Sequence, residues 1–243
     1  YRFSNLFFDN FWTIHELNIS FFESFNVKKS KLHFIDHCQG EYKSMIENDP
    51  TLLLSKDSFC KKYDLPANKK FILFAGRFIQ RKNPKILIEA FHEANLNNDW
   101  FLIMVGNGKF EKDLKLFAEK NKLKNLKFFD FQNQKKIISF FKNSEILVVP
   151  SGQGDTHGNI AAEGIQFGCA LILSNMVGLY PECTKEEIGL VFDITKKNQL
   201  ISHLKLLCNN DDILNRFQNN AFEYGKNKTP EHAADLIIKS LKL

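Results

Sequence analysis

The chain has 243 residues, of which 44% are hydrophobic and 25% are charged. This composition is that of a globular protein with one large or two small domains, and no apolar run approaches the length that spans a bilayer. The net charge of +5 is spread over many lysines, which indicates a solvated surface rather than a dedicated surface for nucleic acid or another polyanion.

The cysteines are odd in number and widely spaced, and none of them forms a CxxC pair: Cys38, Cys60, Cys169, Cys183 and Cys208. This usage predicts reduced thiols in a cytoplasmic protein, and no metal site. The histidines are also scattered without the helical spacing of metal ligands. The first residue is Tyr1 rather than Met, so we expect an upstream segment, and no signal-peptide pattern is recognisable in the given sequence.

Residues 1–37 are predicted to form a strand, a helix and a second strand, at 11–15, 16–25 and 32–36. Three such short elements cannot bury a core of their own. Residues 38–70 are polar and irregular, with one predicted helix near 56–63, and are interpreted as a linker and the entry to a second domain.

From residue 71 onward, short apolar strands alternate with amphipathic helices. The predicted strands are 71–75, 101–105, 126–129, 146–150, 170–174 and 189–193, and the main helices are about 84–95, 109–122, 132–142, 196–207, 210–224 and 229–242. This alternation predicts an α/β fold with a Rossmann-like parallel sheet and helices on both faces. Ligands of such sheets bind beyond the carboxyl ends of the strands, where the strand order reverses, so we expect the site in the loops that follow strands.

The stretch Gly152–Gly168 is rich in glycine and lies between two predicted strands. Asp155 or Thr156 is predicted to cap a short helix, whose first turn would offer backbone N–H groups and a positive dipole end to a phosphate. Glu163 lies about two helical turns after Thr156. A carboxylate among alanines and apolar residues needs a partner, which a sugar diol could be; a paired structural glutamate is the alternative.

The loop after the strand at 71–75 carries Gly76, Arg77, Arg81 and Lys82. Arginine can bind phosphate oxygens in a bidentate manner, and lysine acts as a point charge. These residues therefore indicate a phosphate site, with a solvated basic loop as the alternative.

Two further loops follow strands. Gly106 and Gly108 match neither the dinucleotide fingerprint nor a P-loop, and a tight turn is the alternative to a ligand contact. Phe131 lies in a polar loop, where capping of the next helix is the alternative.

Taken together, these motifs resemble the retaining glycosyltransferases of the GT-B fold, in the large family 4 group. Asp155 and Glu163 are similar to the acidic-x7-Glu motif of that family, with Asp in the usual place of Glu. Gly76-Arg77 followed by Lys82 also matches, and so do the flanks Pro150-Ser151, Phe167–Ser174, Val177-Gly178, Pro181-Glu182 and Gly189–Phe192. The likeness covers roughly residues 30–243.

The resemblance implies the carboxy-terminal half of a GT-B enzyme. Residues 1–37 would be the remnant of the amino-terminal acceptor domain, 38–70 the linker, and 71–243 the nucleotide-sugar donor domain. The implied reaction is that of a hexosyltransferase: transfer of a sugar from a UDP-sugar or GDP-sugar to an acceptor hydroxyl, with retention, in polysaccharide or glycolipid synthesis. No cofactor or metal is expected. A saccharide or lipid-linked acceptor would bring a cytoplasmic enzyme to the inner membrane face, through the missing domain.

The resemblance also implies roles for individual residues. Arg77 and Lys82 would hold the diphosphate and stabilise the charge on the leaving nucleotide, Glu163 would bind the ribose, and Asp155 would bind the donor sugar. The other donor-binding residues would be Gly76, Arg81, Gly106, Gly108, Phe131, His157, Gly158, Asn159 and Ile160, with the last three offering backbone N–H groups to the phosphates. Two alternatives remain: a nucleotide-sugar epimerase, and a non-catalytic nucleotide-binding module, because fold does not fix function.

Overall fold

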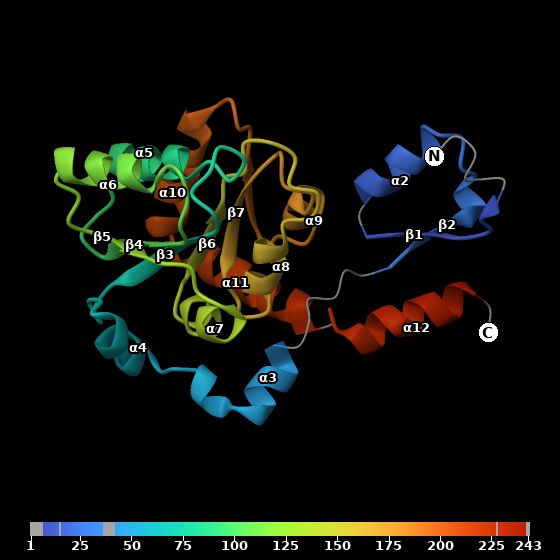
Figure 1. The fold of residues 1–243 in the computed structure, drawn as a ribbon, viewed down its shortest axis with the longest axis horizontal. Helices are drawn as coiled ribbons and strands as arrows, with labels where there is room; N and C mark the ends of the chain where they lie inside the picture. Colours follow the sequence, from blue (N-terminus) through green and yellow to red (C-terminus); the bar gives the residue numbers. More distant parts are fainter. Residues whose placement is uncertain (1–6, 15, 36–41, 227, 242–243) are drawn as a thin grey trace. The chain divides into compact units, whose positions relative to one another are not determined.

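The computed structural model describes residues 7–14, 16–35, 42–226 and 228–241. The chain divides into two compact units (Figure 1). The smaller unit comprises residues 1–40 and 226–243, and the larger unit comprises residues 41–225.

The smaller unit is built on two short parallel strands, β1 (Phe11–Thr13) and β2 (Leu32–Phe34). Between them lie α2 (Glu16–Glu23) and the 3-10 turn η1 (Lys29–Lys31). The predicted strand, helix and strand are therefore present, but shorter; residues 15 and 36, at the predicted strand ends, lie outside the described residues. Helix α12 (Pro230–Ser240) packs on β2, and the Trp12 indole donates a hydrogen bond to Ser240 Oγ at 3.0 Å. Because of these contacts, α12 groups with this unit, whereas residues 71–243 are predicted to form one domain.

The larger unit contains a six-stranded sheet in the order β5-β4-β3-β6-β7-β8, and every paired strand is parallel. The strands are β3 (Lys70–Ala75), β4 (Trp100–Val105), β5 (Leu126–Phe129), β6 (Ile146–Val149), β7 (Ala170–Ser174) and β8 (Gly189–Phe192). The central strands are continuous apolar runs because they are buried on both faces. This sheet confirms the predicted fold class.

Helices cover both faces of this sheet (Figure 1). One face packs against α5 (Pro84–Ala94), α6 (Glu111–Lys120) and α10 (Lys197–Cys208). The other packs against α4 (Lys56–Tyr63), α7 (Gln134–Lys142), α8 (Asn159–Ile165) and α9 (Tyr180–Lys185). Helix α11 (Asp211–Lys226) contributes side chains to both cores.

Strand order reverses between β3 and β6. The chain runs outward from β3 to β4 and β5, then returns to place β6 on the other side of β3. The loops after β3 and β6 therefore diverge at the carboxyl edge of the sheet, which is where ligands of open parallel sheets bind.

Four features of the larger unit differ from expectation. Helix α3 (Tyr42–Asn48), the 3-10 turn η2 (Pro50–Leu52) and helix α9 are additional. Helix α8 begins at Asn159, with Gly158 as its N-cap at φ +85°, so the prediction that Asp155 or Thr156 caps it is wrong. Glycine adopts this left-handed conformation without the steric cost that a Cβ brings, and the helix starts after it.

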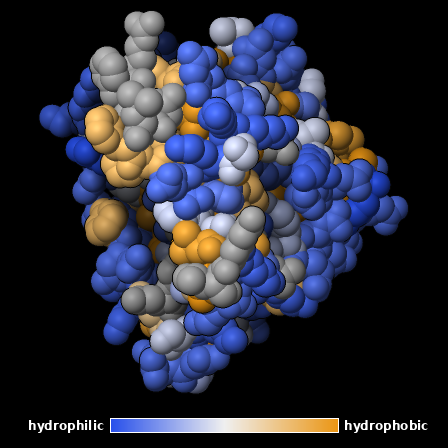
Figure 2. All heavy atoms as spheres, turned by 90° about the vertical axis from the view of Figure 1, so that its right-hand side faces the viewer, coloured by the Kyte–Doolittle hydropathy of each residue, from blue (hydrophilic) through white to orange (hydrophobic). Residues whose placement is uncertain are grey.

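Among the described residues, no helix is both long enough and apolar enough to cross a membrane. In Figure 2 the visible face is mostly hydrophilic, and the apolar side chains on it form separate patches.

Candidate functional site

A cavity of about 250 Å³ lies at the carboxyl ends of β3 and β4, next to the point where strand order reverses. Its wall combines the ends of these strands, the loop after β5, one side of α8, and Tyr42 of α3. Six residues predicted for the site line this cavity: Gly76, Arg77, Gly106, Phe131, Ile160 and Glu163.

Main-chain hydrogen bonds hold the first loops of this wall together. Gly76 N–H donates to the Val105 carbonyl at 2.9 Å, and Gly106 N–H donates to the Phe129 carbonyl at 2.9 Å. Gly106 has φ +143°, and a Cβ there would lie 1.9 Å from the Gly76 carbonyl oxygen. Only glycine fits such an approach of two backbones.

Gly108 has a related role outside the cavity. Its φ is +151°, and a Cβ would lie 2.6 Å from the Phe78 carbonyl oxygen. Gly108 therefore allows the loop after β4 to pack on the loop after β3, and it does not line the cavity. For this residue, the tight turn is the interpretation that the geometry favours.

Among the described residues that line the cavity, Glu163 is the one with an acidic side chain, and it lies beside Tyr42. Burial raises the pKa of Glu163, and the neighbouring Tyr42 hydroxyl offsets part of this rise. Burial and the Glu163 charge in turn raise the pKa of Tyr42. A carboxylate that is half-buried beside a phenol, with Arg77 in the same wall, is suited to accept hydrogen bonds from a polar ligand.

Tyr42 was not predicted as a site residue. It is 3% exposed, and its ring packs edge-on against Phe167 at a centroid distance of 5.7 Å. It is the sole buried side chain of α3, so the surrounding sequence has no apolar period that would mark it. The contact with Glu163 joins segments that are far apart in the chain, and no local signal could have indicated it.

Lys82 and Asp155 pair with each other beside the cavity. Lys82 Nζ donates a hydrogen bond to Asp155 Oδ2, and Ser151 Oγ donates to the same oxygen at 2.9 Å. Burial alone would raise the pKa of Asp155, but the hydrogen bond and charge of Lys82, together with Ser151, outweigh it and lower this pKa. Asp155 is 7% exposed and does not line the cavity.

The backbone around Asp155 is equally constrained. Asp155 N–H donates to the Met176 carbonyl, and Gly178 N–H donates to the Asp155 carbonyl, both at 2.8 Å. Asp155 thus joins the loops after β6 and β7. A Cβ on Gly76, which lines the cavity, would lie 3.9 Å from Lys82 Cγ. The ion pair of Lys82 and Asp155 therefore borders the cavity at Gly76.

The remaining predicted residues lie outside the cavity lining. Arg81 is exposed, and its charge helps to lower the pKa of Asp155. His157 and Gly158 are buried, whereas Asn159 is exposed at the start of α8. The structure therefore divides the predicted site into a cavity group and a Lys82–Asp155 group.

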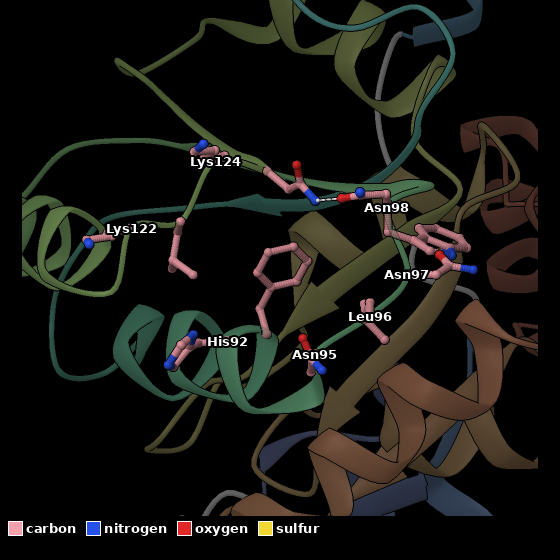
Figure 3. Close-up of a pocket in the computed structure, with 11 residues that line it drawn as sticks. His92, Asn95, Leu96, Asn97, Asn98, Lys122 and Lys124 are labelled. Atoms are coloured by element: carbon pink, nitrogen blue, oxygen red, sulfur yellow. Dashed lines mark hydrogen bonds between the residues drawn. The ribbon is translucent and has the colours of Figure 1, made fainter.

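A second cavity, of about 290 Å³, opens near the amino ends of β4 and β5 (Figure 3). Its polar side chains include His92, Lys122 and Lys124, and Asn125 donates a hydrogen bond to Asn98 at 3.3 Å. These polar side chains are exposed or half-buried, and the cavity lies at the opposite edge of the sheet from the predicted residues. We therefore take the carboxyl-edge cavity as the candidate site.

No group of three or more His, Cys, Asp or Glu side chains in the described part of the chain could hold a metal ion. Cys60, Cys169, Cys183 and Cys208 are free and buried, and burial raises the pKa of Cys169 and Cys183. Buried thiols with a raised pKa are unreactive. Cys38 lies outside the described residues.

The fold is that of solved glycosyltransferases of the GT-B type. The structure of Anabaena HepE in complex with UDP superposes on it with a TM-score of 0.80 at 15% identity, over 98% of this chain and 65% of that one. Residues 55–224 match the family model described as Glycosyl transferases group 1, and the chain belongs to this family.

Curated relatives agree with this assignment. An uncharacterized glycosyltransferase of Methanocaldococcus jannaschii is 28% identical over 156 residues, which is 64% of this chain and 43% of the relative. The O-antigen chain mannosyltransferase C of Escherichia coli is 24% identical over 171 residues, 69% of this chain and 45% of the relative. The chain thus spans less than half the length of these relatives.

Proposed function

We propose that the larger unit binds the nucleoside diphosphate part of a sugar donor, for transfer of a hexose to an acceptor hydroxyl with retention. The observation that carries this proposal is the placement of Arg77 and Glu163 in one cavity at the reversal of strand order. The cavity offers a cation for phosphate and a carboxylate for a sugar diol.

Within the cavity, we assign the base to the wall that includes Phe131 and Ile160. Phe131 is 69% exposed, so its ring is available for stacking on a base. Glu163 would accept hydrogen bonds from ribose hydroxyls, and Arg77 would bind the diphosphate. The backbone N–H groups of Gly158, Asn159 and Ile160 remain proposed phosphate ligands.

The Lys82–Asp155 pair extends this site toward the transferred sugar. A lysine ammonium has three N–H donors, and the bond to Asp155 leaves two for phosphate oxygens. Both side-chain hydrogen bonds of Asp155 use Oδ2, which leaves Oδ1 for a sugar hydroxyl. Lys82 and Arg77 would stabilise the charge on the leaving diphosphate in place of a metal ion.

The acceptor is proposed to be a saccharide or a lipid-linked saccharide. The name of the Escherichia coli relative, an O-antigen chain mannosyltransferase, supports a polysaccharide product. The UDP in the Anabaena structure supports a UDP-sugar donor, with a GDP-sugar as the other candidate. Residues 1–37 are proposed to belong to an acceptor domain, so this chain alone would bind donor and turn over slowly.

Calorimetric titration with UDP, GDP and ADP, with and without magnesium, tests the donor site. One nucleotide should bind without metal, and Glu163→Gln and Arg77→Gln should each weaken it about tenfold or more, because each loses a charge-assisted hydrogen bond. Glu119→Gln and Arg216→Gln are the matched controls, since neither residue lines the cavity. A folded chain that binds none of the three nucleotides would contradict the proposal.

Product analysis then tests the reaction. Donor incubated with a saccharide acceptor should give a glycoside with the anomeric configuration of the donor, which NMR determines. Conversion of the donor sugar without acceptor would instead indicate an epimerase, and binding with no conversion in either case would indicate a non-catalytic module.

A further inference from the structure

Tyr42 presents a buried hydroxyl to the candidate cavity. The side chain lines the cavity next to Glu163 and is 3% exposed. Within the described part of the chain, its hydroxyl makes no hydrogen bond of normal geometry, although it lies close enough to Glu163 for each group to shift the pKa of the other. Buried polar groups in native proteins are almost always hydrogen-bonded, and an exception needs an explanation.

The chemistry of the two groups suggests what would satisfy them. A phenol donates a hydrogen bond and a carboxylate accepts one. A ligand hydroxyl can do both at once: its oxygen accepts from Tyr42 while its hydrogen is donated to Glu163. A phosphate could not take this position, because the carboxylate would repel it.

We propose that Tyr42 and Glu163 together bind the ribose hydroxyls of the donor nucleotide, with Tyr42 as a direct ligand. This inference rests on the proposed function, because it assumes a nucleotide in this cavity. It adds a binding residue from α3, the helix that follows the boundary between the two units.

The competing explanation is purely structural. The Tyr42 ring packs against Phe167, and this contact alone could anchor α3. Tyr42→Phe separates the two roles, because it keeps the ring and removes only the hydroxyl.

The test compares a ribonucleotide with its 2′,3′-dideoxy analogue on the full chain. The nucleotide is whichever of UDP, GDP and ADP binds wild type most tightly. Tyr42→Phe should weaken the ribonucleotide about five- to tenfold, the loss of one hydrogen bond, and should leave the affinity for the dideoxy analogue unchanged. Glu163→Gln should show the same selectivity, and Tyr63→Phe, at a tyrosine of α4 that does not line the cavity, should bind both nucleotides as wild type does.

Each other outcome overturns the inference. Equal loss for both nucleotides in Tyr42→Phe would assign Tyr42 a structural role, and no loss would show that its hydroxyl does not contact the ribose. Because both ligands are titrated into the same preparation, a partial folding defect affects both affinities alike and cannot imitate the expected selectivity. Wild type that binds no nucleotide would defeat the proposed function itself, a result distinct from the two above.

Discussion

Lys82 and Asp155 lie in separate loops and are brought together by the tertiary structure. The sequence motifs predict that both residues bind the donor, but in the structure each is the partner of the other. Asp155 is one methylene shorter than glutamate, and it lies at a bridge between the loops after β6 and β7. The pair therefore contributes to the stability of the site as well as to its charge.

Lys82→Met should lower the free energy of unfolding by roughly 2–4 kcal/mol, because it leaves the buried Asp155 carboxylate without its cation. Lys85→Met is the matched control: Lys85 pairs with Asp113 on the surface at 2.9 Å, and an exposed pair contributes about 1 kcal/mol or less. Urea denaturation of both variants measures the difference. Equal effects would mean that the Asp155 pair is no more important for folding than a surface pair.

Glu163→Gln should stabilise the protein at pH 7 while it weakens nucleotide binding. The folded-state pKa of Glu163 is raised by burial, so its contribution to stability is present in acid and is lost as the pH rises through that pKa. The glutamine variant has no charge to bury and so does not lose this stability. Its melting temperature should exceed that of wild type by about 2–4 °C for each kcal/mol gained in the free energy of unfolding. Thermal melts from pH 4 to pH 8 should show that the difference in melting temperature between variant and wild type becomes smaller in acid. A difference that stays constant over this range would mean that it does not arise from the ionisation of Glu163.

Among the secondary-structure elements, the bounds of the buried strands were predicted well, whereas the short helix α9 and the first residue of α8 were not. The strands predicted at 71–75, 146–150 and 170–174 appear within one residue of those bounds, because a continuous apolar run has few alternatives in a covered sheet. Helix α9 has only six residues, too few for a period. Helix α8 starts late because Gly158 takes a left-handed conformation that depends on its surroundings.

The arrangement of the predicted site residues followed from the sequence only in part. Arg77 and Glu163 line one cavity, because loops after strands of a parallel sheet meet at one edge. The proximity of Glu163 to Tyr42, and the ion pair between Lys82 and Asp155, depend on side-chain packing between distant segments. Sequence spacing carries no information about either.

Gly106→Ala should destabilise the protein by about 3 kcal/mol or more, because the new methyl group would collide with the Gly76 carbonyl and the backbone is strained for any L-residue. Gly154→Ala is the matched control, since a Cβ there has nothing within 4 Å. Chemical denaturation of the two variants tests this. A Gly106 variant as stable as the Gly154 variant would show that the loops after β3 and β4 can move apart at little cost.

At the scale of the whole molecule, the two units differ in how much core they bury. In the larger unit, two apolar clusters cover the two faces of the sheet. In the smaller unit, the buried side chains among the described residues are Thr13, Val27 and Ala233. Two strands of three residues are marginal on their own.

Hydrogen exchange should therefore proceed faster in β1 and β2 than in β3, β4 and β7. Local opening requires less free energy where few apolar contacts are broken. Exchange followed by mass spectrometry on peptides from the native chain measures this difference. Equal protection of both sheets would show that the smaller unit gains stability from contacts beyond its own core.

Main-chain hydrogen bonds connect the loops and strand ends that form the wall of the candidate cavity. Gly76 and Gly106 donate backbone hydrogen bonds to the last residues of β4 and β5, and Phe78 donates one to Asn107, at 2.8–2.9 Å. None of these bonds involves the side chains of Arg77, Asn107 or Phe131. Asn107 and Phe131 can therefore be randomised in a mutant library without loss of these backbone bonds, whereas Arg77 is kept for the proposed diphosphate contact. Because the proposed function places the base against Phe131, selection from such a library would change the preference for the nucleotide base while the protein remains folded.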